Sequence, residues 1–339
     1  VYGAAVGITG ESLVMCGRRT CRTERTAMKN EKKKKTQKTG LLKSFRTQKQ
    51  IWMICLVALI WVIIFCYIPM LGNVIAFFDY VPGKSLLDCE FIGLKHWKDF
   101  FALPDMWRVF RNTLVISGLN MTVGFVAPII FALLLNEIHQ TIFKKVIQTI
   151  SYLPYFISWV VVASILMTLL GTEGNINELL MALGITEKPI SFLNEKNMFW
   201  GILTSANIWK DLGWSAIIYI SAIAGVDQEL YQAGSVDGLG RFGKVRHITL
   251  PGIAPTIILL FIMNIGNILN AGFEQQLLIG TPLTKEVYEN IDTYVYRYGV
   301  QIGRYSFATA IGLMKSVIGF ALVILANRIS GKVADMRLF

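Results

Sequence analysis

The residues of this chain best suited to a chemical or mechanical task lie in one polar, glycine-rich segment between two apolar stretches. The segment reads VDQELYQAGSVDGLGRFGKVRHITLPG, from Val226 to Gly252. Asp227 is a suitable N-cap for a short helix over Glu229–Gly234, because its carboxylate can accept a free backbone N–H. Gly238 and Gly240 predict a sharp turn with positive φ angles. A charged segment of this kind, returned between two apolar stretches, indicates a docking surface for a soluble partner.

A second short helix is predicted after the turn, through Phe242, Val245 and His247. Pro251 then falls where the next apolar stretch begins, a position that tolerates proline. The result would be a helix–turn–helix held by short connections at both ends, which is what an element that transmits force requires. An ordinary loop containing a turn is the alternative.

Three asparagines within an apolar stretch form a second group of candidates. Asn264, Asn267 and Asn270 are spaced by three residues, so they are expected to share roughly one face of a helix. Polar groups in a membrane span usually face a bundle interior or a wet cavity. Amides both donate and accept hydrogen bonds, which suits the hydroxyl groups of a sugar on a translocation path. Hydrogen bonding between neighbouring helices is the alternative role.

Five further residues are candidates for the same substrate path. Lys210, Trp214 and Tyr219 precede the polar segment, and Glu274 and Gln275 follow the asparagines. Aromatic rings beside polar groups favour a sugar, although Trp and Tyr also form belts at the membrane surface. Glu274 and Gln275 are expected at the outer end of the fifth span, where a solvated helix end is the alternative.

Two lysines within apolar stretches have structural alternatives. Lys210 is followed by Asp211, and the two could form a local ion pair or a snorkelled helix end. Lys315 stands alone in its stretch and is expected to be a structural partner of a buried acceptor, with a contact to a ligand as the alternative.

The composition indicates a polytopic membrane protein. Of 339 residues, 54% are hydrophobic and 16% are charged, and the mean hydropathy is +0.51. The net charge of +11 is concentrated in the first fifty residues, next to an apolar stretch, so we expect it to face anionic lipid rather than nucleic acid. The five cysteines suggest neither a disulfide framework nor a metal site. The scattered histidines form no catalytic constellation.

Six membrane-spanning helices are expected in an all-α fold. They cover Ile51–Leu71, Thr113–Leu135, Ile150–Leu170, Phe199–Ala224, Ile253–Ala271 and Phe307–Ala326. Lys and Arg are concentrated in both terminal segments and in the polar segment. Because cytoplasmic segments of membrane proteins carry an excess of Lys and Arg, we expect these three segments in the cytoplasm. The expected organisation is a basic, largely disordered cytoplasmic tail (1–49), a membrane domain (50–329) and a cytoplasmic C-terminal tail (330–339). Residues 1–27 are hypothesised to be an extended reading frame ahead of Met28, or a disordered tail.

The polar segment resembles the EAA loop of binding-protein-dependent ABC import permeases. Seven residues match at the family's spacing: Tyr231, Ala233, Asp237, Gly238, Ile248, Leu250 and Pro251. Gln232 replaces the family's glutamate and Gly234 its second alanine, which puts the strength of coupling in doubt. Three other phrases are similar to the carbohydrate branch and most of all to its polysaccharide-permease (LplB-like) group: SYLPYFISWVVVASI from Ser151, NEL from Asn177 and NAGFEQ from Asn270. The likeness covers about Leu42–Ile329.

This resemblance implies a type I ABC importer permease fold and a multi-pass protein of the bacterial cytoplasmic membrane. It implies import of an oligosaccharide or other carbohydrate together with a second permease, two cytosolic ATPases that use ATP-Mg and an extracellular or lipid-anchored sugar-binding protein. The seven matching residues, together with Gln232 and Gly234, would couple the pore to the ATPase. This chain is expected to hold no cofactor and no ATPase activity, because Gly83-Lys84-Ser85 would complete a phosphate-binding loop pattern only if Phe78 were glycine.

Two other functions fit the residues less well. A gradient-driven secondary transporter needs acids within its spans and often has an internal repeat, but Asp211 is the single candidate acid and no repeat is evident. A membrane scaffold or receptor would not need asparagines along a span.

Overall fold

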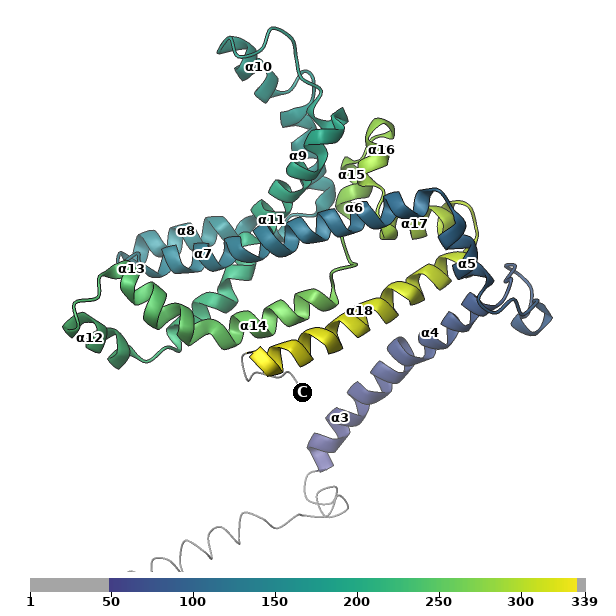
Figure 1. The fold of residues 1–339 in the computed structure, drawn as a ribbon, viewed down its shortest axis with the longest axis horizontal. Coiled ribbons are helices and arrows are strands. Elements are labelled where there is room, and N and C mark those ends of the chain that lie inside the picture. The colour runs from purple at the N-terminus through teal and green to yellow at the C-terminus, as the bar shows by residue number, and fades with distance from the viewer. Residues whose placement is uncertain (1–48, 334–339) are drawn as a thin grey trace, which may run out of the picture. The chain divides into compact units, whose positions relative to one another are not determined.

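The computed structural model describes residues 49–333, and the chain there is almost entirely helical (Figure 1). Within that range, β pairing is limited to one isolated bridge between Phe78 and Phe91. The chain divides into two units, Val1–Gly72 and Asn73–Phe339, which we describe separately. The expected basic tail lies outside the described residues except for Lys49, and so do residues 334–339.

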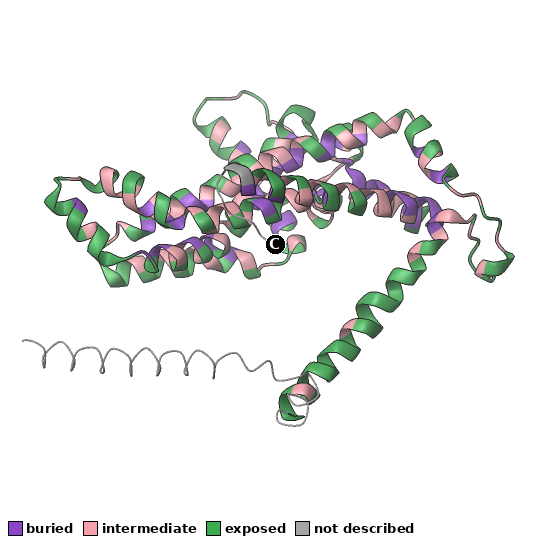
Figure 2. Cartoon of the chain, turned by 60° about the horizontal axis from the view of Figure 1, so that its bottom comes forward, coloured by how far each residue is buried: buried purple, intermediate pink, exposed green. Residues whose placement is uncertain are grey.

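The described part of the first unit is one apolar helix. It consists of α3 (Lys49–Val62), a π-helical turn (Ile63–Tyr67) and α4 (Ile68–Leu71). Its apolar side chains are exposed on every face, as the green ribbon in Figure 2 shows. A helix that is hydrophobic all round is suited to lipid or to the interior of a larger assembly. The expected span Ile51–Leu71 is therefore present as a helix.

The second unit is a set of helices of very different lengths. Its named α-helices are α5 (Lys95–Ala102), α6 (Asp105–Leu119), α7 (Phe125–Asn136), α8 (Thr141–Tyr152), α9 (Trp159–Leu170), α10 (Asn175–Ala182), α11 (Lys196–Ala224), α12 (Gln228–Val236), α13 (Arg241–Lys244), α14 (Leu250–Gly266), α15 (Glu274–Ile279), α16 (Lys285–Tyr288), α17 (Ile291–Tyr296) and α18 (Tyr305–Val333). Figure 1 shows α12 near one end of this unit and α5 and α17 near the other.

Five helical stretches of the described chain are long and apolar enough to cross a membrane. They are Lys49–Phe77, Asp105–Asn136, Trp159–Ala182, Arg241–Gly266 and Tyr305–Gly331. The remaining expected span, Phe199–Ala224, lies within α11, which has 29 residues but is not among the five. Lys210 and Asp211 lie in the middle of α11 and lower its hydropathy. The count of six spans and the cytoplasmic termini stay predictions.

Four prolines of the described chain lie in helices that continue past them; three of these prolines follow a π-helical turn, and Pro255 of α14 does not. The turns Ile63–Tyr67, Asn120–Gly124 and Val245–Thr249 each contain the residue four positions before Pro69, Pro128 or Pro251. Proline removes one N–H, and its ring crowds the carbonyl four residues earlier. A π turn is a local widening of the helix. It gives that carbonyl room at these three prolines.

The third expected span is not a continuous helix. The chain leaves α8 at Tyr152, forms a 3-10 turn over Leu153–Phe156 and starts α9 only at Trp159. Pro154 lies in that turn, and the Ser158 side chain caps the new helix by accepting a hydrogen bond from Val161 N at 3.4 Å. The prediction of one helix over Ile150–Leu170 was therefore wrong, because hydropathy does not register a proline and a cap.

The fifth expected span also ends early. α14 stops at Gly266, and residues 267–273 form turns and irregular chain before α15 begins at Glu274. The helix end coincides with a close approach of α14 to α18, where a Cβ on Gly266 would collide with the Val323 side chain. Asn270 is consequently not on the helical face predicted for it.

Three clusters of buried apolar side chains hold the second unit together. One joins α5, α6, α17 and α18 around Phe100 and Phe307. Another joins α6, α9, α11 and α15 around Ile116 and Leu203. The third joins α7, α11 and α14 around Tyr219, and the polar segment packs on it. α6 and α11 each take part in two clusters, and α11 also packs against α7, α8 and α14, so it is the central support of the unit.

Charged side chains bind α17 to its neighbours. Lys315 of α18 forms an ion pair with Asp292 of α17, which confirms the expected structural partner for this lysine. Glu289, with only 2% of its side chain exposed, lies 2.8 Å from both Arg108 and Arg297. A buried carboxylate requires such partners, because an unpaired charge in an apolar interior is strongly unfavourable.

Replacing Gly213 by alanine should destabilise the protein. The added Cβ would collide with the backbone of Ser151 and lie 2.8 Å from the Tyr152 ring, so α8 and α11 would have to separate. We expect a loss of about 1–3 kcal/mol, measured as a lower melting temperature of the purified protein. The matched control is Gly201→Ala in the same helix, where nothing lies within 4 Å of the new Cβ. Equal stability of the two variants would contradict the close approach.

Replacing Lys315 by methionine should destabilise the protein by leaving Asp292 unpaired. Their side chains are 15% and 23% exposed, so we expect a loss of about 1–3 kcal/mol, less than for a fully buried pair. The double variant Lys315→Met with Asp292→Asn should be more stable than Lys315→Met alone, as melting temperatures would show. Additive losses would mean that the two side chains do not interact.

Candidate functional site

The polar segment forms the predicted short helix and turn. α12 begins after Asp227, whose Oδ1 accepts a hydrogen bond from Glu229 N at 2.9 Å. The turn that follows has Gly238 at φ +77°, as expected. Gly240 has φ −68°, so the positive φ predicted for it was wrong. One left-handed residue is enough here, because Leu239 N already closes the turn on Gly234 O at 2.8 Å.

The second predicted helix is not a separate element. α13 continues through the π turn Val245–Thr249 directly into α14, so Pro251 lies inside a long helix instead of at its start. A movement of the turn would therefore reach α14 without an intervening loop.

Three contacts fix α12 against that long helix. The Tyr231 hydroxyl lies 2.9 Å from Thr249 Oγ1, and Lys244 Nζ donates to Ser235 Oγ at 2.7 Å. Gly234 is buried, and a Cβ there would lie 2.8 Å from Ile248 Cδ1. Glycine at this position thus permits the close approach of two helices. This packing offsets the cost of glycine in a helix, which is about 1 kcal/mol relative to alanine.

The nine residues of the EAA-like pattern divide into two groups. Tyr231, Gly234, Ile248 and Leu250 pack inward, the aromatic and aliphatic ones on the cluster around Tyr219. The other five are exposed: Gln232, Ala233, Asp237, Gly238 and Pro251. Exposed apolar side chains lie among them that the pattern did not include: Leu230 at 53%, Val236 at 87% and Phe242 at 77% exposed. Isolated apolar side chains are common on surfaces, but their grouping on one projecting turn indicates a contact surface.

A cavity of about 440 Å3 lies between α7, α11 and the end of α14. Its lining includes most of the residues predicted for a substrate path: Trp214, Tyr219, Asn264, Asn270 and Gln275. The tertiary structure thus brings amides from separate segments to one space. Amides, a hydroxyl and an indole ring can bind a polyhydroxylated molecule through many directed hydrogen bonds and one flat apolar surface.

Three predicted path residues are not in the lining of this cavity. Asn267 lines a second cavity of about 330 Å3 with Lys315, between α14 and α18. Glu274 lines neither of these cavities and lies exposed at the start of α15. Lys210 is 7% exposed and directed at backbone carbonyls.

Four polar residues of the lining were not predicted for the path: Asn120, Asn207, Asp211 and Ser215. Within the cavity wall, the Asn207 amide donates a hydrogen bond to Asn120 Oδ1 at 3.3 Å. On α11 the lining residues recur at positions 207, 208, 211, 212, 214, 215, 218 and 219, which is the spacing of one broad helical face. That periodicity was available in the sequence and would have indicated Asn207 and Ser215.

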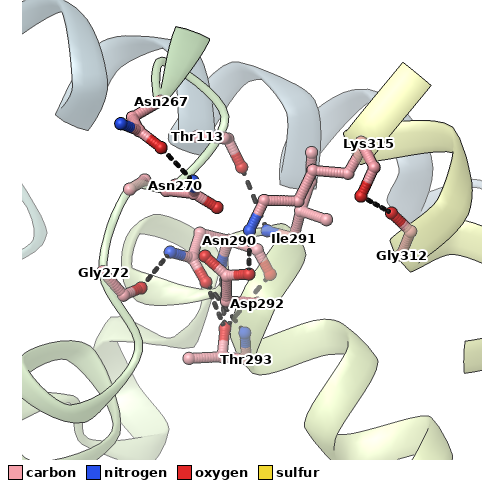
Figure 3. A network of polar contacts seen from close by, with 12 residues as sticks. Thr113, Asn267, Asn270, Gly272, Asn290, Ile291, Asp292, Thr293, Gly312 and Lys315 are labelled. Atoms are coloured by element: carbon pink, nitrogen blue, oxygen red, sulfur yellow. Dashed lines mark hydrogen bonds and ion pairs between the residues drawn. The ribbon is translucent and has the colours of Figure 1, made fainter. Parts of the chain in front are cut away.

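The irregular segment after α14 forms one wall of the cavity. Figure 3 shows the polar contacts that Asn270 and Gly272 of this segment make. Leu269 and Ala271 are buried in two different apolar clusters, and Asn270 between them lines the cavity. Asn290 donates to Gly272 O at 2.6 Å, and Asn270 donates to the Oδ1 of the asparagine three residues before it at 2.9 Å. These anchors give the irregular wall a defined position.

Lys210 lies directly behind another part of the wall. Its ammonium donates to Tyr155 O at 2.6 Å and to Pro154 O at 3.5 Å. The Tyr155 ring stacks on Trp214, with ring centroids 4.4 Å apart and planes 6° apart. Lys210 therefore supports the break between α8 and α9, which is a different role from the local ion pair with Asp211.

Comparison with known proteins agrees with these features. Residues 124–335 match the model of a family described as "Binding-protein-dependent transport system inner membrane component". The chain is 43% identical over 297 residues to Protein LplB of Bacillus subtilis (strain 168), covering 87% of this chain and 93% of that one. It is 42% identical over 303 residues to the polygalacturonan/rhamnogalacturonan transport system permease protein YteP of the same organism, covering 89% and 94%.

Solved structures are similar as well. A chain in the crystal structure of a bacterial alginate ABC transporter, in complex with an alginate pentasaccharide-bound periplasmic protein, matches with a TM-score of 0.80 and 36% identity. The match covers 88% of this chain and 99% of that chain. The family match over most of the chain, together with these relatives, shows that the chain belongs to the inner membrane components of binding-protein-dependent transport systems.

Proposed function

We propose that this chain is the permease subunit of an ATP-driven importer that moves an oligosaccharide or other carbohydrate across the cytoplasmic membrane. The observation that carries the proposal is the cavity lined by amides, a tyrosine and a tryptophan, joined through α11 and α14 to an exposed helix and turn. A gradient-driven transporter is not favoured, because the chain belongs to a family of binding-protein-dependent systems.

The carbohydrate substrate is supported by the chemistry of the lining and by the relatives. The amide groups of Asn120, Asn207, Asn264, Asn270 and Gln275 match the alternating donors and acceptors of sugar hydroxyls. YteP is named for transport of polygalacturonan and rhamnogalacturonan, and the similar solved structure is an alginate transporter. The two predicted path residues Lys210 and Glu274 would act at the edge of this cavity or outside it.

The exposed turn is proposed to receive the motion of a separate ATPase. Gln232, Ala233, Asp237 and Gly238 would contact it, together with the apolar side chains beside them. The remaining residues of the EAA-like pattern would transmit the motion, because they join α12 to the long helix that ends at the cavity: Tyr231, Gly234, Ile248, Leu250 and Pro251. Closing of the ATPase would tilt α11 and α14 and change the side on which the cavity opens.

The other subunits follow from this arrangement. One chain supplies a wall of the cavity, and we propose that a second, related permease supplies the other. Two cytosolic ATPases would bind ATP-Mg and hydrolyse it. An extracellular or lipid-anchored binding protein would deliver the carbohydrate, a role supported by the pentasaccharide-bound periplasmic protein in complex with the similar alginate transporter. This chain would need no cofactor of its own.

Replacing Gly238 by valine should abolish uptake while leaving membrane insertion intact. Nothing lies within 4 Å of a Cβ at this position, so the effect would come from its φ of +77°, which a β-branched residue adopts only with strain. Uptake of labelled oligosaccharide by cells, with the membrane content of the protein measured in parallel, tests this. Gly240→Val is the matched control, because its φ of −68° suits any residue. Normal uptake by Gly238→Val would refute the proposed role of the turn.

A reconstituted importer should hydrolyse ATP faster when it receives its carbohydrate. The complete complex in proteoliposomes would be tested with its binding protein and a panel of neutral and uronate oligosaccharides. Stimulation by at least one oligosaccharide, lost when Asn264 and Asn270 are both replaced by leucine, is the expected result. If no carbohydrate stimulates hydrolysis but another class of solute does, the carbohydrate proposal is wrong.

A further inference from the structure

Among the described residues of the second unit, one buried cation has only uncharged partners at bonding distance. Lys210, in the middle of α11, is 7% exposed and donates to the carbonyl oxygens of Tyr155 and Pro154. Its Nζ also lies 5.2 Å from the centre of the Tyr155 ring and 5.9 Å from that of Trp159. A desolvated ammonium is unfavourable in an apolar interior unless such groups compensate for lost water. The carbonyl groups and aromatic rings around Lys210 therefore stabilise its ammonium at this position, and the ammonium in turn satisfies these carbonyls.

The acceptors of Lys210 belong to the interruption between α8 and α9. A break in a helix leaves backbone carbonyls without partners, and where water is excluded it is tolerated only if side chains satisfy them. Tyr155 lies in the 3-10 turn of this interruption, and its carbonyl oxygen accepts the 2.6 Å hydrogen bond from Lys210. Gly213, one turn further along α11, packs against the backbone of Ser151. The interruption and the last turn of α8 before it are thus held on α11 at two successive turns.

The same interruption carries an aromatic ring to the wall of the cavity. The Tyr155 ring stacks on Trp214 with its plane 6° from parallel, and Phe156 meets the same indole edge-on with centroids 6.1 Å apart. Trp214 lines the cavity and is 44% exposed. Because Tyr155 and Phe156 both pack on the Trp214 indole, they restrict its rotation, and its exposed face keeps one orientation.

We propose that Lys210 is a positioning residue for carbohydrate binding, which it supports by holding the Tyr155–Trp214 stack against the cavity. Trp214 then offers a flat apolar surface to the C–H face of a sugar ring, while the amides around it bind the hydroxyl groups. This inference rests on the proposed function and assigns different roles to Lys210, Trp214 and the amides within it. Lys210 acts through the Tyr155 backbone and does not touch the substrate.

Equilibrium binding tests the inference in the purified complex of permeases and ATPases, in lipid nanodiscs without the binding protein. The probe is the radiolabelled oligosaccharide that stimulates hydrolysis most strongly in the wild-type importer. Lys210→Met should raise the dissociation constant of this oligosaccharide about tenfold, because without the hydrogen bond to Tyr155 O the Tyr155–Trp214 stack is no longer held in place. Lys210→Arg, which keeps a donor, should bind close to wild type, and the matched control Lys188→Met, at an exposed lysine, should bind as wild type.

Two further variants separate positioning from a general effect on folding. Tyr155→Leu keeps the backbone acceptor of Lys210 but removes the stacked ring, so it should weaken binding as much as Lys210→Met. The double variant Lys210→Met with Trp214→Ala should bind no more weakly than Trp214→Ala alone, because both changes remove the same platform.

Three results would overturn the inference. One is unchanged binding in Lys210→Met or, if that variant does not fold, in Tyr155→Leu. Another is additive losses in the double variant. The third is a fall in protein yield and melting temperature without any change in affinity. If no oligosaccharide binds the wild-type complex, the proposed carbohydrate path itself fails, which is a distinct outcome.

Discussion

Interrupted helices impose the constraint on which the rest of this structure depends. An interrupted helix leaves N–H and carbonyl groups free, and each of them must find a partner in the protein or border a wet space. Two expected spans in the described part of the chain contain such a break, at 153–158 and at 267–273. Lys210 supplies a partner at the first break, and Asn290 supplies one at the second through Gly272. Both breaks border the cavity, either directly or through Trp214.

α11 connects these features because it takes part in two apolar clusters and carries one face of the cavity. Lys210 and Asp211 lie in the middle of α11 and lower its hydropathy, and the same two residues contribute to the cavity and its support. Tyr219 is buried against α7 and α14 where the polar segment also packs. A displacement of that segment would therefore reach the cavity through packed side chains. Packed interiors transmit strain because they contain few voids to absorb it.

Proline and glycine have distinct mechanical roles in the helices. At Pro69, Pro128 and Pro251 the helix continues after a π turn, and at Pro255 α14 continues without one. At Gly266 the helix ends, next to the point where α14 and α18 come into close contact. The continuity at Pro251 matters for the proposed function, because it joins the exposed turn to the wall of the cavity by one helix. A separate helix–turn–helix would have allowed the two to move independently.

Much of this protein could be deduced from its residues one by one. The apolar stretches, the Asp227 cap and the left-handed Gly238 are local features, since each depends on hydropathy or on backbone preference within a few residues. The family likeness, now shown by its relatives, rested on the same short-range pattern. Lys315 was correctly assigned a structural partner, because a lone cation in an apolar stretch requires one, but nothing in its surroundings named Asp292.

The tertiary structure decided where the helices break and which polar side chains meet. Asn264 and Asn270 line one cavity although the helix between them ends, and Asn267 lines another. Lys210 is directed away from the cavity because its ammonium donates a hydrogen bond to a carbonyl 55 residues earlier in the chain. Spacing along a sequence specifies the face of a regular helix and no more. Once a helix is interrupted, the direction of each side chain depends on long-range packing and hydrogen bonds, and these exist only in the folded protein.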